Sequence, residues 1–88
     1  MSLEILIQRN KESLDRLLDR IRNKDYDSKG MLKKIDIDCM HHISELSRYD
    51  FQTASEYYDK YNELRYGIKI IKEGKGYKII KDRRRFKI

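Results

Sequence analysis

The sequence predicts a mainly helical α+β fold, with an antiparallel helical hairpin or three-helix unit over residues 1–66 and a basic β-hairpin and tail over residues 67–88. Two observations predict it. Apolar residues recur at intervals of three and four in the first part, whereas two short β-branched and aromatic runs flank a glycine-bearing turn in the second. A length of 88 residues fits one domain, residues 1–88.

The first helix is expected over residues 3–21, with Ser2 as its N-cap. Its apolar residues follow a heptad spacing in which Asn10 fills one position with a polar group. Such a residue faces solvent at the edge of a helical hairpin, or fixes the register of a dimer at a cost in stability. Because so short a chain buries a small core, we favour a homodimer. The apolar positions are Leu3, Ile7, Leu14, Leu17 and Ile21.

Two further helical patterns follow. The second begins near Met31, after a segment rich in turn formers that ends at Gly30. Asp50 either caps a third helix or lies within one continuous rod, and Gly67 is a good helix stop because glycine accepts the left-handed conformation. The second pattern holds Leu32, Ile35, Cys39, Ile43 and Leu46, and the third holds Phe51, Ala54, Tyr58, Tyr61 and Leu64.

The last quarter of the chain changes character. Residues 68–72 and 77–81 predict the two strands of a β-hairpin, with a turn that contains Gly74 and Gly76. An isolated hairpin is marginally stable, so we expect this one to pack on the helices or to pair with the edge of another copy.

The positive charge is concentrated in this last quarter. The formal net charge is +6, of which residues 1–66 contribute −1 and residues 67–88 contribute +7. Clustered cations repel one another unless a polyanion neutralises them, and a phosphate backbone does so with release of counterions. The sequence therefore predicts a non-enzymatic nucleic-acid-binding accessory or regulatory protein. The expected contacts are Lys69, Lys72, Lys75, Tyr77, Lys78, Lys81, Arg83, Arg84, Arg85, Phe86 and Lys87.

Aromatic residues among these cations slightly favour RNA or other single strands over duplex DNA, because unpaired bases stack on aromatic rings. Tyr66 adds aromatic surface beside the same segment. The alternative function is a small inhibitor or adaptor, of the type that bacteriophages make, that binds another protein. It would use the basic end for steering and a tyrosine patch as its anchor. The patch consists of Tyr57, Tyr58 and Tyr61, for which packing in the core is the competing interpretation.

Catalytic and metal sites are not predicted. Cys39 and His42 share a helix face and Asp38 lies near them, but zinc generally takes three or four protein ligands and no second ligand pair exists. A nucleophilic Cys39 would need a third, orienting group, and none is evident. We therefore expect no enzyme activity, cofactor or metal. A single cysteine, no signal-peptide pattern and apolar runs of at most three residues favour a cytoplasmic protein without a membrane partner.

Overall fold

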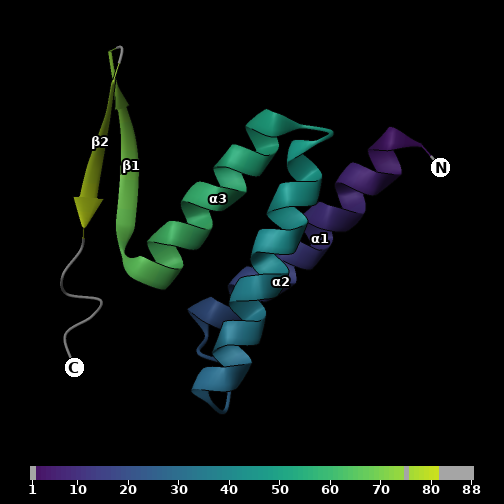
Figure 1. The fold of residues 1–88 in the computed structure, drawn as a ribbon, viewed down its shortest axis with the longest axis vertical. Helices are drawn as coiled ribbons and strands as arrows, with labels where there is room; N and C mark the ends of the chain where they lie inside the picture. Colours follow the sequence, from purple (N-terminus) through teal and green to yellow (C-terminus); the bar gives the residue numbers. More distant parts are fainter. Residues whose placement is uncertain (1, 75, 82–88) are drawn as a thin grey trace.

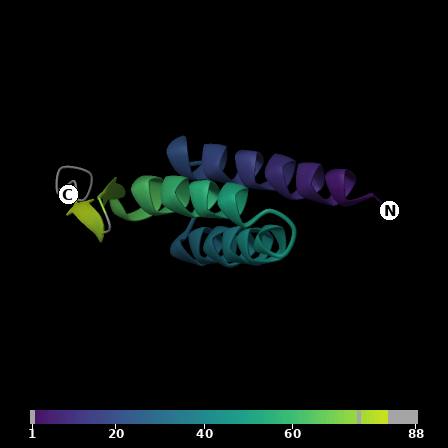
Figure 2. The same cartoon turned by 90° about the horizontal axis from the view of Figure 1, so that it is seen from above.

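The computed structural model describes residues 2–74 and 76–81 of the chain. Its helices are α1 (Leu3–Arg22), α2 (Lys29–Ser47) and α3 (Phe51–Tyr66). Figures 1 and 2 show α2 running back along α1, and α3 turning again to pack beside both. No helix among the described residues has the combination of length and apolar character that crossing a membrane requires.

Side-chain caps set where each helix begins. The hydroxyls of Ser2 and Ser28 accept hydrogen bonds from backbone N–H groups in the first turns of α1 and α2. Asp50 caps α3, where it accepts from the backbone N–H and the hydroxyl of Thr53 at 3.1 and 2.7 Å. These bonds hold the pKa of the Asp50 carboxyl below its ordinary value. The cap shows that the second and third helices are separate and not one rod.

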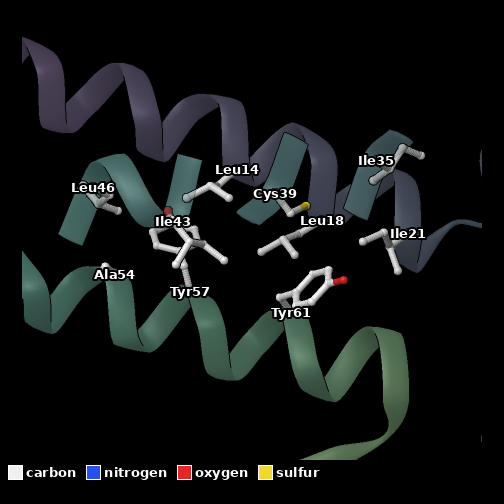
Figure 3. Close-up of a cluster of buried hydrophobic side chains, with 10 residues drawn as sticks. All are labelled: Leu14, Leu18, Ile21, Ile35, Cys39, Ile43, Leu46, Ala54, Tyr57 and Tyr61. Carbon is white, nitrogen blue, oxygen red and sulfur yellow. The ribbon is translucent and has the colours of Figure 1, made fainter. Parts of the chain in front are cut away.

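The core lies between the three helices. Each helix contributes a stripe of apolar side chains, and Figure 3 shows the three stripes meeting. Leu14, Ile35 and Leu46 are at most 1% exposed, and burial of each such side chain stabilises the fold by roughly 1.5–3 kcal/mol. The buried hydrophobic residues are Leu14, Leu18, Ile21, Ile35, Cys39, Ile43, Leu46, Ala54, Tyr57 and Tyr61.

Helix α3 buries only part of the face predicted for it, since Ala54 and Tyr61 lie in the core and Leu64 packs against it. The expected row included Phe51 and Tyr58, but these side chains are 74% and 41% exposed. Tyr57 is buried instead, at 6% exposure. The Tyr57 hydroxyl donates to Asp15 of α1 at 2.8 Å. A buried tyrosine needs a hydrogen-bond acceptor for its hydroxyl, and Asp15 provides one for Tyr57.

Beyond α3 the backbone is extended. Strands β1 (Ile68–Glu73) and β2 (Gly76–Lys81) pair antiparallel, with Ile68 opposite Lys81 and Glu73 opposite Gly76. Figures 1 and 2 show this pair past the C-terminal end of α3, apart from α1 and α2.

The predicted α+β fold class is wrong. The hydrophobic core of the described residues is formed by α1, α2 and α3, so the fold is a three-helix unit. A basic β-hairpin was expected as part of the fold, either packed on the helices or paired with the edge of another copy. The apolar stripes of the three helices are buried against one another and form the core. The predicted tail, residues 82–88, lies outside the described residues.

Candidate nucleic-acid interface

The basic segment leaves the helical core at the last turn of α3. Gly67 ends this helix in the left-handed conformation, with φ +66°, and its N–H donates to the carbonyl groups of Asn62 and Glu63. Glycine reaches this conformation without steric cost, so the chain can turn out of the helix at this point. Residues 67–88 therefore begin from a defined position on the core.

An ion pair supports this exit point from α2. The Arg65 Nε donates to both carboxylate oxygens of Asp36, at 3.0 and 3.1 Å. The same carboxylate accepts the Tyr61 hydroxyl at 2.8 Å. The hydrogen bonds to Asp36 raise the pKa of Arg65, and burial, with the bond to Asp36, raises the pKa of Tyr61 well above its ordinary value. Both groups thus keep their protons, and the turn that precedes the basic segment is fixed to the core.

Tyr66 is the last residue of α3 and its ring is held on two sides. The Arg65 guanidinium lies over the ring, 5.0 Å from its centre. The Tyr61 ring meets it edge to face, with the ring centres 6.1 Å apart. Tyr66 is nevertheless 41% exposed. The sequence predicts Tyr66 as aromatic surface beside the basic segment but not among the contact residues, because an aromatic residue at a helix end has no distinguishing sequence pattern.

The strand pairing separates the predicted lysine contacts along the ladder. Lys69 is paired with Ile80 and Lys72 with Tyr77, while Lys78 is paired with Ile71 and Lys81 with Ile68. No lysine is paired directly with another, so the register avoids the destabilising placement of like charges opposite each other. The remaining predicted contacts lie outside the described residues, namely Lys75, Arg83, Arg84, Arg85, Phe86 and Lys87.

The predicted protein-interface patch needs correction. Tyr57 and Tyr61 are 6% and 4% exposed, and their hydroxyls are hydrogen-bonded inside the fold, so neither side chain offers a surface to a partner. Burial raises the pKa of Tyr57 to about 12. Of the three tyrosines, Tyr58 alone is exposed. The chain brings the other two together in the core because their hydroxyls reach carboxylates on α1 and α2.

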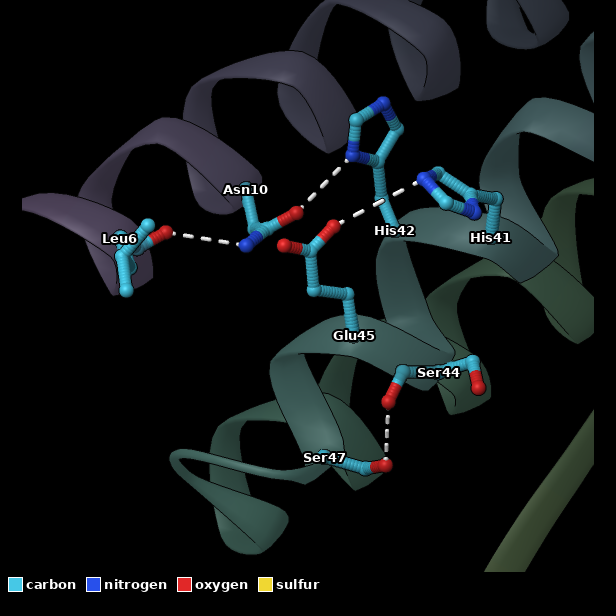
Figure 4. Close-up of polar contacts among 7 residues, drawn as sticks. All are labelled: Leu6, Asn10, His41, His42, Ser44, Glu45 and Ser47. Carbon is cyan, nitrogen blue, oxygen red and sulfur yellow. Dashed lines mark hydrogen bonds and ion pairs between the residues drawn. The ribbon is translucent and has the colours of Figure 1, made fainter. Parts of the chain in front are cut away.

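Of the residues considered for a metal or nucleophile, His42 has another partner and Cys39 is buried. His42 Nδ1 lies 2.9 Å from Asn10 Oδ1, whose amide nitrogen donates to the Leu6 carbonyl (Figure 4). Cys39 is fully buried, and this burial, with nearby Asp36, raises its thiol pKa to about 12, so the thiolate that a nucleophile needs is strongly disfavoured.

Other polar groups of the described core are likewise engaged. Asn10 is 5% exposed and its side chain contacts His42, which links α1 to α2. The polar position in the predicted heptad pattern therefore has its partner within the same chain. His41 lies 3.6 Å from Glu45 on the same helix (Figure 4). Within the described part of the chain, no buried side-chain nitrogen or oxygen lacks a hydrogen-bond partner. The core therefore uses its buried polar groups to join helices.

A shallow groove lies between α1 and α3. Its lining mixes acidic and basic groups, with Asp15 already accepting the hydroxyl of Tyr57 and Asp19 paired with Arg22 at 2.7 Å. Lys60 also lines it and stands over the Tyr57 ring at 5.2 Å. This mixture of signs gives the groove no clear preference for a polyanion. Comparison with protein family models, characterised proteins and solved structures finds no match to the chain.

Proposed function

We propose that this protein is a non-enzymatic nucleic-acid-binding protein in which the helical core is a scaffold and residues 67–88 make the contacts. The observation that carries the proposal is the separation of charge. Residues 1–66 hold a net charge of −1, whereas residues 67–88 hold +7. A polyanion relieves the repulsion among these cations, and release of its counterions supplies the binding free energy.

The placement of the strands supports separate roles for the helical core and residues 67–88. β1 and β2 extend from the end of α3 and stand apart from α1 and α2 (Figure 1). The polar groups of the helical core are meanwhile engaged in joining its helices, as with Asp36 and Asn10. Binding through the C-terminal segment therefore needs no rearrangement of the core.

The adaptor or inhibitor alternative keeps less support. Two of its three proposed anchors, Tyr57 and Tyr61, are buried. Tyr58 remains exposed, and Phe51 is 74% exposed on the same helix. A protein partner would therefore bind α3 through these two side chains, and a pull-down with Phe51→Ser and Tyr58→Ser variants is the test of that alternative.

The proposed function is tested by fluorescence anisotropy with labelled single-stranded RNA, single-stranded DNA and duplex DNA at several salt concentrations. We expect a dissociation constant below ~10 µM near physiological salt, and a steep fall of affinity with salt. Absence of binding to all three ligands at low salt would refute the function.

A pair of variants with equal charge separates specific contacts from overall charge. Arg83, Arg84 and Arg85 changed together to Ala should reduce the salt slope for a single strand by about 2, because each lost phosphate contact contributes about 0.7. Lys29, Lys33 and Lys34 are exposed on α2, and changing them to Ala removes the same charge from the core. That control should leave the slope nearly unchanged. Equal effects of the two triple variants would contradict the proposed location.

A further inference from the structure

The Tyr66 ring is exposed to solvent and is also held in position by neighbouring side chains. The Arg65 guanidinium and the Tyr61 ring contact it, and 41% of the residue stays exposed. Both contacting residues are bound to Asp36 of α2, and Tyr61 is itself 4% exposed in the core. The ring is therefore held by side chains that are held in turn by the core.

A ring fixed in this way is suited to stacking. Binding usually costs the entropy of ordering a side chain, and a ring that the fold already orders avoids that cost. Unpaired bases offer flat faces to aromatic rings whatever their sequence, whereas the bases of a duplex are stacked on one another. An exposed, ordered ring beside a cationic segment therefore favours a single strand as the ligand.

Tyr66 also lies next to the cationic segment in the chain. It directly precedes Gly67, from which the segment with a net charge of +7 begins. Proteins that bind single strands combine cations that follow the phosphate backbone with aromatic rings on which the bases stack. We propose that Tyr66 stacks on an unpaired base of a single-stranded nucleic acid whose phosphates are bound by residues 67–88. This inference rests on the proposed function and specifies its ligand class.

Tyr58 provides a matched control on the same helix. It has the same exposed fraction as Tyr66, 41%, but lies two turns earlier in α3 and away from the exit of the basic segment. A general effect of exposed tyrosines on binding would involve both residues. Stacking at the proposed site involves Tyr66 alone.

The absence of tryptophan from the chain allows a direct optical test. Tyr66→Trp and Tyr58→Trp each introduce a single indole, whose emission is quenched when a base stacks on it. Each full-length variant is titrated with oligo(U), oligo(dT) and a duplex DNA, with anisotropy of the labelled oligonucleotide recorded in parallel. We expect quenching of Tyr66→Trp by the single strands, with the stronger of the two identifying RNA or DNA, and little quenching of Tyr58→Trp.

Affinity measurements provide a second readout, which separates the effect of the ring from the effect of charge. Tyr66→Ala should weaken single-strand binding about ten- to a hundred-fold at every salt concentration, while leaving the salt slope unchanged because the ring carries no charge. Tyr66→Phe keeps the ring and should retain most of the affinity. Circular dichroism checks that each variant keeps its helices.

The outcomes separate this inference from the function on which it rests. If the wild-type chain binds with a steep salt slope, but Tyr66→Trp is not quenched and Tyr66→Ala binds normally, the stacking role is wrong and the proposed function stands. Equal quenching of both tryptophan variants, or stronger binding to the duplex than to single strands, also overturns the stacking role. If the wild-type chain binds none of the oligonucleotides, both proposals are wrong.

Discussion

Alkaline pH should unfold the helical core, because three buried groups must remain protonated in it. Burial raises the pKa of Tyr57 and of Cys39 to about 12, from ordinary values of 10.0 and 9.0. Tyr61 is shifted in the same direction, by burial and by its hydrogen bonds. A raised folded-state pKa gives stability that is complete below the unfolded value and is lost as pH rises towards the folded value.

The size of the effect follows from the shifts. Each such group removes about 1.4 kcal/mol of stability per pH unit within its window. Between the ordinary pKa and about pH 12, Tyr57 removes about 3 kcal/mol and Cys39 about 4 kcal/mol. The two together remove about 7 kcal/mol, which is comparable to the whole stability of a typical domain. Tyr61 adds to this loss in the same direction. The helices should therefore melt before pH 12 is reached.

The assay is a pH titration followed by far-UV circular dichroism and by tyrosinate absorbance. Loss of helix should begin above pH 10 and coincide with ionisation of the last of the seven tyrosines. The double variant Tyr57→Phe, Tyr61→Phe removes two of the three titrating groups and should make the loss less steep. Full helicity at pH 12, with all tyrosines ionised in one early step, would refute the reasoning.

Three further variants test the core and its junction with the basic segment. Gly67→Ala should destabilise the fold by about 1–2 kcal/mol, because a side chain at φ +66° is strained, and thermal unfolding measures this loss. Asp36→Ala removes the acceptor of both Arg65 and the Tyr61 hydroxyl and should cost about 2–3 kcal/mol. Asp15→Ala, which removes the acceptor of one hydroxyl from an exposed position, should cost about 1 kcal/mol in urea unfolding. Equal costs for the two aspartates would show that the Arg65 pair adds nothing.

Helix limits could be predicted from sequence because local chemistry sets them. Ser2 was expected as an N-cap and Gly67 as a C-terminal stop, and each has that role. Asp50 was expected as an N-cap in one of two alternatives, and it is one. Capping depends on hydrogen bonds within a turn, so the residues that make it are neighbours in sequence. The sequence alone leaves one rod or two helices open, and the Asp50 cap gives two.

The orientation of α3 could not be predicted, because it depends on residues distant in sequence. Tyr57 and Tyr58 are adjacent, and the apolar spacing alone supports a core face through either of them. Asp15 decides between them by accepting the Tyr57 hydroxyl across 42 positions of sequence. Asn10 is a second example. Its place in the heptad pattern was predicted, but its partner His42 lies 32 residues away in sequence and was not.

Part of the candidate site could be predicted from sequence, and part required the structure. Charge counting is independent of structure, so it locates the basic excess in residues 67–88 without a fold. The role proposed for Tyr66 needs the ring contacts with Arg65 and Tyr61, which only the packing of α3 on α2 through Asp36 produces.

The central claim is that residues 67–88 bind nucleic acid while the helical core serves as a scaffold. Its most direct test is amide chemical-shift mapping of the full-length, isotope-labelled chain as a single strand of about ten nucleotides is added. We expect shifts confined to residues 65–88, with the signals of α1 and α2 unchanged. Shifts centred on α1 or α2, with residues 67–88 unaffected, would contradict it.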